Sequence, residues 1–267
     1  MQKSSAKLIY NLIKKTIGRG IHHLHEPLFS QSEIKLTSET IKKNYVSSVG
    51  IYSKKFEDKI KKLTKAKYVI AVINGTQALF ISMQALGIKK DQEVLVPSLT
   101  FVGTVNAICY TGAEPHFVDS NIKDLGIDFK KLEIYLNKIS KIKNNRCINK
   151  KTGKIISGII PVHIFGHACD VESLARIAKK FRLKIIEDAA EAVGSFYKKK
   201  HLGTFGDVGC LSFNGNKIIT TGGGGAVLSK SKKINDKIKH LISTAKIDHK
   251  WEYIHDEIGY NFKLPSL

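Results

Sequence analysis

Short runs of apolar residues alternate with longer amphipathic stretches from about residue 68 onward. Six runs rich in β-branched residues predict buried strands at 68–73, 93–97, 115–119, 158–162, 183–188 and 208–213. Helical spacing of apolar residues predicts helices at 76–86, 101–111, 171–180 and 234–244. Strands that alternate with helices are typical of a mostly parallel sheet covered on both faces, so we predict an α/β fold.

Two stretches depart from this alternation. Residues 138–154 are rich in Lys and Asn, and we interpret them as a solvated loop. Residues 7–17 place apolar residues at helical spacing beside lysines, without the apolar core and cleavage site of a secretion signal. We predict a surface helix that packs against the main body there, with membrane association as the less favoured alternative.

The composition is that of a globular protein with an unusual charge. Of the 267 residues 42% are hydrophobic and 25% charged, but the formal net charge is +21. Such a charge leaves nucleic-acid binding open as an alternative. The sequence shows no nucleic-acid-binding motif, and its lysines are dispersed, so we favour a solvated basic surface that attracts anionic ligands.

The four cysteines, at 109, 147, 169 and 210, form no C-x-x-C pair. Their spacing argues against a zinc site and a disulfide framework, and it fits a reduced cytoplasm. No apolar run approaches the length of a membrane span. We therefore expect a cytoplasmic protein with no metal site, and with neither nucleic acid nor a membrane among its partners.

Ligands of parallel α/β sheets bind beyond the carboxyl ends of the strands. The segments that follow the predicted strands are therefore the candidate site. These segments are 74–76, 97–101, 163–166, 188–191 and 212–217.

The first of these segments has the properties of a phosphate site. Gly75 permits a tight turn, and Thr76 can cap the following helix, whose first N–H groups and positive dipole end attract an anion. A plain strand-to-helix turn explains residues 74–76 equally well. The chain has no P-loop motif, so nucleoside triphosphate binding is not indicated.

A carboxylate and a lysine add chemistry to this edge. Asp188 ends an apolar strand, where it is costly unless it meets a cation or donors, although helix capping explains it as well. Glu191 follows three residues later, and Lys217 precedes four glycines, 222–225, which suit a tightly crossed strand entry. Together they suit an aldehyde cofactor held on the lysine, with its ring nitrogen protonated by the aspartate.

Eight short motifs occur in order along the chain. They are His25-Glu-Pro27, Val46-Ser-Ser-Val-Gly50, Asn74-Gly-Thr-Gln-Ala-Leu79, Val96-Pro-Ser-Leu-Thr-Phe101, Pro161-Val-His163, Glu187-Asp-Ala-Ala-Glu191, Ser212-Phe-Asn-Gly-Asn-Lys217 and Gly259-Tyr-Asn261. Through this series residues 23–267 resemble the DegT/DnrJ-type sugar aminotransferases, which use pyridoxal 5'-phosphate on the aspartate-aminotransferase-like fold (fold type I). The nearest subgroup aminates UDP-linked 4-keto-6-deoxy sugars on the bacillosamine and legionaminic-acid routes.

The resemblance implies catalytic roles for two residues. Lys217 would hold the cofactor aldehyde and move the substrate proton, and Asp188 would pair with the ring nitrogen. Lysine at this position favours transamination, because relatives that dehydrate sugars carry histidine there. We expect His163 to fill the core rather than to orient the site.

The resemblance also implies cofactor contacts. Phe101 would stack on the ring, and Glu191, where the family usually has Gln or His, would face the phenolic oxygen. The backbone of Gly75 and Thr76, the Thr76 side chain and Ser212 would bind the phosphate. Asn261 would reach the phosphate of a neighbouring subunit, which implies a homodimer.

The implied function is transfer of an amino group, with glutamate as the expected donor, to a nucleotide-linked 4-keto-6-deoxy sugar. We divide the chain into an N-terminal helical and substrate-loop segment, 1–56, and a cofactor-binding large domain, 57–267. Relatives continue into a small C-terminal domain, which we expect to be missing from this chain. A truncated, inactive fragment that still binds cofactor or subunits is therefore the main alternative.

Overall fold

The computed structural model describes residues 2–18, 20–21, 25–48 and 50–267, with side chains from residue 5 onward. Val49, in the middle of the 46–50 motif, lies outside the described residues, as do parts of the predicted N-terminal segment.

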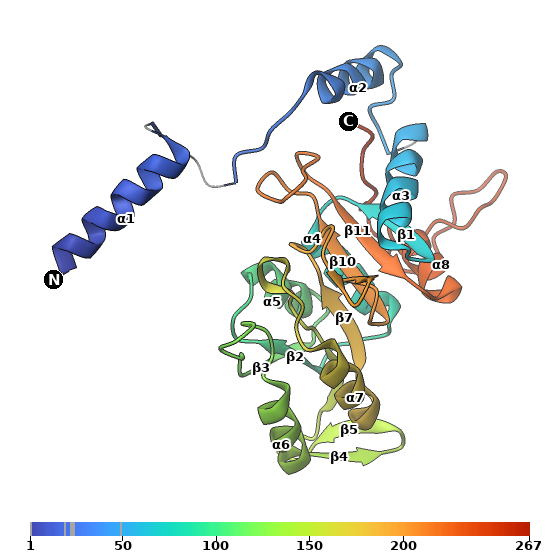
Figure 1. The fold of residues 1–267 in the computed structure, drawn as a ribbon. Coiled ribbons are helices and arrows are strands. Elements are labelled where there is room, and N and C mark those ends of the chain that lie inside the picture. Colours follow the sequence, from blue (N-terminus) through green and yellow to red (C-terminus); the bar gives the residue numbers. More distant parts are fainter. Residues whose placement is uncertain (1, 19, 22–24, 49) are drawn as a thin grey trace.

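Helices and strands alternate along most of the described chain (Figure 1). The helices are α1 Gln2–Ile17, α2 Gln31–Lys42, α3 Ile51–Thr64, α4 Gly75–Ala85, α5 Val102–Tyr110, α6 Phe129–Ile139, α7 Val171–Phe181 and α8 Lys232–Leu241, with a 3-10 turn at Ile164–Gly166. The strands are β1 Tyr68–Val72, β2 Glu93–Pro97, β3 Glu114–Val118, β4 Ser140–Lys143, β5 Arg146–Asn149, β6 Ile155–Ile159, β7 Lys184–Asp188, β8 Phe196–Tyr197, β9 Lys200–His201, β10 Val208–Ser212 and β11 Gly225–Ser229.

The central sheet has the strand order β1-β11-β10-β7-β6-β2-β3. Strands β10, β7, β6, β2 and β3 pair in parallel, whereas β11 is antiparallel to both of its neighbours. This mostly parallel sheet confirms the predicted α/β fold. Because β1 and β10 both oppose β11, their carboxyl ends meet those of the other parallel strands at one edge.

Apolar side chains from alternate strand positions feed cores on the two faces of the sheet. Val94 and Val96 of β2 belong to a core that includes residues of α4, α5 and α8. Leu95, between them, belongs to a second core with residues of α6 and α7. This alternation follows from the two-residue period of a strand. Helix α3 closes a third core over β1, β10 and β11, so the predicted division between residues 56 and 57 falls inside a helix that packs on the sheet.

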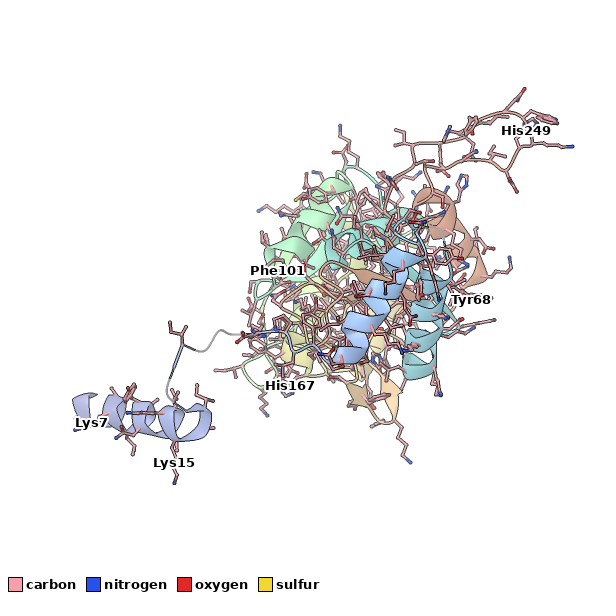
Figure 2. The ribbon with its side chains drawn as sticks, turned by 90° about the horizontal axis from the view of Figure 1, so that it is seen from above. Lys7, Lys15, Tyr68, Phe101, His167 and His249 are labelled. Carbon is pink, nitrogen blue, oxygen red and sulfur yellow. The ribbon has the colours of Figure 1, made fainter. Side chains whose placement is uncertain are left out.

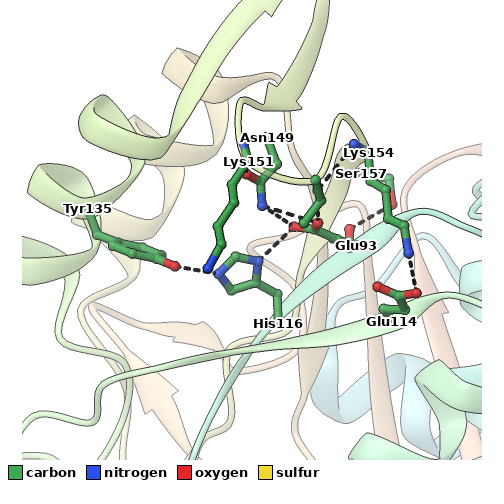
Figure 3. A network of polar contacts seen from close by, with 9 residues as sticks. Glu93, Glu114, His116, Tyr135, Asn149, Lys151, Lys154 and Ser157 are labelled. Atoms are coloured by element: carbon green, nitrogen blue, oxygen red, sulfur yellow. Dashed lines mark hydrogen bonds and ion pairs between the residues drawn. The ribbon is translucent and has the colours of Figure 1, made fainter.

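The prediction of a solvated loop at 138–154 is wrong, because β4 and β5 form an antiparallel hairpin there that pairs with β6. Polar residues of the hairpin reach the buried carboxylate of Glu93, at the amino end of β2 (Figure 3). Thr152 donates at 2.5 Å, Asn149 donates at 2.9 Å, and Nδ1 of His116 lies 2.7 Å away. Burial raises the pKa of Glu93, but these hydrogen bonds outweigh it and leave the pKa lowered. The polar side chains of Asn149 and Thr152 therefore stabilise this part of the fold through a buried carboxylate.

Helix α1 forms where the sequence predicts a helix, but its packing differs from the prediction. Its apolar side chains are exposed, for example Leu8 at 72% and Leu12 at 64%, and α1 stands apart from the sheet in both Figure 1 and Figure 2. The prediction that this helix packs against the main body is therefore wrong.

Other sequence-based expectations concern cysteines and membranes. Cys109 is exposed and the other three cysteines are buried, and all four are free thiols. Among the described residues, none of the helices combines the length and the apolar character that a membrane crossing needs.

Candidate functional site

A cavity of about 610 Å³ opens at the edge where the parallel strands end. Its walls come from the segments that follow β1, β2, β6, β7 and β10. Among the predicted site residues, those that line it are Gly75, Thr76, Phe101, Asp188, Glu191, Ser212 and Lys217. The structure therefore brings together seven side chains or turns that are up to 142 residues apart in sequence, from position 75 to position 217.

Lys217 lies in the connection between β10 and the antiparallel β11. This connection is closed by backbone hydrogen bonds from Phe213 to Gly224 at 2.8 Å and from Thr221 to Phe213 at 2.9 Å. The Lys217 side chain is 15% exposed, and its amine lies 3.2 Å from Oε1 of Glu191. The loop thus holds one amine against a carboxylate at the cavity wall.

The glycine run that follows Lys217 is needed for close backbone contact. A Cβ at Gly225, the first residue of β11, would lie 2.5 Å from the carbonyl group of Asn74. Only glycine lets the two chains cross this closely, as the sequence predicts.

Asp188 is the last residue of β7 and is 5% exposed. Its Oδ2 accepts a hydrogen bond from Thr104 Oγ1 at 2.6 Å, and its Oδ1 accepts one from the N–H of Ala190 at 3.2 Å. Burial raises the pKa of Asp188, although Thr104, Ala190 and the charge of Lys217 act in the opposite direction. The carboxylate is therefore under-compensated, and a further cation in the cavity would stabilise it.

Thr104 was not predicted as a site residue. Its Oγ1 accepts a hydrogen bond from Thr100 Oγ1 at 3.0 Å and donates one to Oδ2 of Asp188. Thr100 lies just before α5 and Thr104 in its first turn, so the two hydroxyls meet where the helix begins. Sequence alone gave no signal for Thr104, because its partner Asp188 is 84 residues away.

Glu191 is held from two sides. Besides the Lys217 amine, the N–H of Phe165 donates to its Oε2 at 3.0 Å. Phe165 adopts a left-handed conformation, with φ 51° and ψ 27°, and such a backbone is uncommon for a non-glycine residue. The bend aims this N–H at the carboxylate, and no sequence pattern indicated it.

The turn before α4 differs in detail from the prediction. Asn74, not Thr76, caps the helix, because its side chain accepts from the N–H of Gln77 at 2.9 Å. Gly75 and Thr76 thus occupy the first two helical positions, where N–H groups have no acceptor within the helix. A Cβ on Gly75 would lie 2.9 Å from Cβ of Ser212, so the serine hydroxyl sits beside these N–H groups. Two amides and a hydroxyl at a helix N-terminus form a suitable anion seat.

Three other predicted residues have distinct positions. Phe101 lies at the cavity rim and is 74% exposed (Figure 2). His163 is buried, as predicted, with Nε2 3.0 Å from the buried carboxylate of Glu187. Asn261 is exposed, pairs with Ser243 in a short β-bridge and is not among the residues that line the cavity.

Glu187 anchors the strand end behind the cavity. Burial raises its pKa, but the hydrogen bonds of His163 and the N–H groups of Gly203 and Gly206 outweigh burial and leave the pKa lowered. Hydrogen bonds thus compensate the burial of the Glu187 carboxylate, whereas they do not fully compensate the burial of the neighbouring Asp188 carboxylate.

The family model for the DegT/DnrJ/EryC1/StrS aminotransferase family matches residues 27–267. The chain belongs to this family. It is 40% identical over 244 residues to a GDP-perosamine synthase from Escherichia coli O157:H7, an alignment that covers 91% of this chain and 62% of that protein. It is 33% identical to the putative pyridoxal phosphate-dependent aminotransferase EpsN of Bacillus subtilis, covering 92% of this chain and 60% of that protein.

Solved aminotransferase structures share the fold. The aminotransferase from Psychrobacter cryohalolentis superposes with a TM-score of 0.79 at 29% identity, covering 90% of this chain and 60% of that one. A DegT/DnrJ/EryC1/StrS aminotransferase from Brucella abortus gives a TM-score of 0.80 at 29% identity, with 92% and 64% covered. These neighbours confirm the aminotransferase fold type I. The chain spans about 60% of the length of the relatives that it matches.

Members of the DegT/DnrJ/EryC1/StrS family use pyridoxal phosphate, which agrees with the cofactor expected from the sequence. Three features of the cavity fit this group: a largely buried amine, a buried carboxylate whose charge is only partly compensated, and a helix N-terminus with a neighbouring hydroxyl. Lys217, Asp188 and Ser212 are the side chains at these three points.

Proposed function

We propose that the chain is the cofactor-binding part of a sugar aminotransferase that passes an amino group from glutamate to a nucleotide-linked 4-keto-6-deoxy sugar. The observation that carries this proposal is the convergence of the Lys217 amine and the desolvated Asp188 carboxylate on one cavity beside an anion seat. A cofactor with a phosphate, a basic ring nitrogen and an aldehyde satisfies all three groups together.

Pyridoxal phosphate supplies an electron-withdrawing ring that stabilises negative charge at a carbon that loses its proton. The role of Asp188 follows from its burial, because a carboxylate that lacks a cation favours a protonated ring nitrogen. Thr104, supported by Thr100, fixes the orientation of this carboxylate through its hydrogen bond to Oδ2.

Lys217 is the candidate for both covalent attachment and proton movement. Its amine sits at the cavity wall on a loop fixed by backbone hydrogen bonds. Glu191 orients this amine, and Phe165 in turn orients Glu191 through its N–H. We propose that Glu191 orients the amine before the cofactor binds and that it would face the phenolic oxygen of the ring in the loaded protein.

The proposed acceptor is supported by relatives and by charge. The relatives include a GDP-perosamine synthase at 40% identity and a UDP-N-acetyl-3-dehydro-alpha-D-glucosamine 3-aminotransferase from Acidithiobacillus ferrooxidans at 30% identity. Both names refer to nucleotide-linked sugars. A net charge of +21 attracts a nucleotide diphosphate to the open cavity. We further propose the cytoplasm as the compartment, because the chain carries four free thiols.

Two consecutive half-reactions test this function. The protein loaded with pyridoxal phosphate is mixed with L-glutamate, and we expect its visible absorption band to bleach. Addition of a UDP- or GDP-linked 4-keto-6-deoxy sugar should then restore the band and yield an amino sugar detectable by mass spectrometry. A band that forms but resists every amino acid would identify a cofactor-binding protein without turnover and would refute the proposed activity.

A further inference from the structure

Helix α1 presents a broad apolar surface that the rest of the described chain does not cover. Its exposed fractions are 72% for Leu8, 58% for Ile9, 64% for Leu12, 51% for Ile13 and 50% for Ile17. Figures 1 and 2 both place the helix away from the sheet and its cores. Removing such side chains from water is favourable, so this surface calls for a partner.

The charged residues of α1 lie on the other side. At 100° per residue, the five apolar residues share an arc of roughly 180°, whereas Lys7, Asn11 and Lys14 fall opposite. Lys15 lies at the border of the apolar arc, and the Lys14 amine lies 5.7 Å from the centre of the Tyr10 ring at the other border. Lysines placed at the edges of an apolar face can extend their amines away from it.

The charge of this segment is of one sign. No Asp or Glu precedes Glu26 in the sequence, while lysines occur at positions 3, 7, 14 and 15. Helix α2 also exposes apolar residues, yet it carries Glu33 and Glu39 and lies within the part matched by the family model, residues 27–267. Helix α1 lies outside that match, so the aminotransferase fold does not account for it.

An anionic lipid surface complements both faces of α1. The apolar arc can enter the boundary between headgroups and acyl chains while the lysines contact lipid phosphates. Sixteen residues span about 24 Å, which is short of the ~30 Å hydrocarbon core, so the helix would lie on the membrane and not cross it. A second copy of the helix fits less well, because it would cover the apolar arc but leave Lys7 and Lys14, on the opposite side, without an anionic partner.

We propose that α1 is an interfacial anchor that binds the protein to anionic lipid bilayers. This inference is independent of the proposed transamination. It reverses the preference drawn from the sequence alone, because the packing on the main body that favoured a membrane-free helix is absent among the described residues.

Vesicle co-sedimentation tests the anchor with the full chain. We expect it to bind vesicles of phosphatidylcholine with roughly 30 mol % phosphatidylglycerol, and to stay in the supernatant with phosphatidylcholine alone, since the lysines supply the selectivity. Binding to the anionic vesicles should weaken as salt is raised.

Two sets of substitutions separate the faces of the helix. The triple change Lys7→Gln, Lys14→Gln and Lys15→Gln should lower the partition coefficient about 100-fold, or about fivefold per lysine. The double change Ile9→Ser and Leu12→Ser should lower it at least about tenfold without altering charge. Lys14 is half-buried and the other four side chains are exposed, so circular dichroism should be unchanged.

Matched controls keep the test specific. Lys130→Gln, Lys199→Gln and Lys233→Gln remove the same charge from exposed positions of the main body and should change partitioning by less than about twofold. Equal binding to neutral and anionic vesicles, or full binding by both α1 variants, would overturn the proposal. Absence of vesicle binding together with α1-dependent self-association would instead assign the surface to a second copy.

Discussion

The carboxylate of Asp188 is desolvated at the end of β7, and burial raises its pKa above the ordinary value of 3.8. A raised pKa in the folded state gives a stability contribution that is complete below the unfolded pKa and is lost as the pH rises through the folded pKa. Asp188→Asn keeps an oxygen for Thr104 and removes this loss. Without cofactor, the variant should match the wild type near pH 4 and melt at a higher temperature at pH 7.

With cofactor bound, the Asp188→Asn variant should react more slowly than the wild type. The variant lacks the charge that pairs with the ring nitrogen, and loss of such an interaction costs about 100-fold or more in rate. Stopped-flow measurement of the glutamate half-reaction checks this rate. Thr104→Val serves as a second variant, because it removes the hydrogen bond to the same carboxylate. A wild-type rate for Asp188→Asn would exclude the proposed role.

Glu191 offers a second test at this scale. Glu191→Gln removes the carboxylate that lies 3.2 Å from the Lys217 amine, so the amine loses the charged contact that orients it at the cavity wall. We expect the visible band to appear several-fold more slowly on mixing with pyridoxal phosphate, with a modest factor because Glu191 is 38% exposed. Glu172→Gln, which breaks a surface pair with Lys198, is the control; equal rates in all three proteins would contradict the orienting role.

The sequence located most of the candidate site because polar residues at strand ends stand out against apolar runs. Asp188 and Lys217 are examples, since Asp188 ends the strand β7 and Lys217 follows the buried strand β10 closely. It could not locate Phe165, whose contribution is a backbone N–H in a left-handed turn. Nor did it find Thr104, whose hydroxyl acquires meaning only when α5 meets β7 in space.

At the scale of elements, the β4–β5 hairpin depends on the buried carboxylate of Glu93. Glu93→Gln removes the charge that the Thr152, Asn149 and His116 groups satisfy, and we expect it to cost about 1–3 kcal/mol in the free energy of unfolding by urea. The pKa of Glu93 is lowered in the folded state, so this difference should shrink as the pH falls below about 4.

The same network contains its control. Glu114 pairs with Lys154 at the surface, and Glu114→Gln should change stability by less than about 1 kcal/mol. Cofactor absorption should be unaffected by either change, because Glu93 begins β2 whereas the cavity lies beyond its carboxyl end. A neutral effect of Glu93→Gln would contradict the anchoring role.

Buried strands were predictable because short runs rich in β-branched and other apolar residues, set between helical stretches, have few alternatives in a folded chain. The observed β2 matches its predicted limits, and β7 and β10 differ by one residue at one end. The hairpin at 140–149 was missed because its lysines and asparagines indicate solvent, whereas long-range partners such as Glu93 make it ordered. Sequence periodicity does not reveal such partners.

At the scale of the molecule, the resemblance implies that Asn261 reaches the cofactor phosphate of a neighbouring subunit, and Asn261 lies outside the cavity of its own chain. We predict a homodimer, measurable by light scattering as twice the chain mass of 29.7 kDa. Asn261, exposed and outside the cavity, should then contact the partner's cofactor phosphate. Asn261→Ala should weaken pyridoxal phosphate binding several-fold without changing the dimer mass. A monomeric wild type, or an Asn261→Ala protein with wild-type cofactor affinity, would contradict this prediction.

The account rests on Lys217 as the residue that binds the cofactor covalently, and reductive trapping tests this directly. The protein is loaded with pyridoxal phosphate, reduced with borohydride, digested and analysed by mass spectrometry. We predict that the cofactor mass appears on the peptide containing Lys217 and disappears in Lys217→Arg, which keeps the positive charge opposite Glu191. Label spread over the surface lysines, or retained in full by Lys217→Arg, would contradict the account.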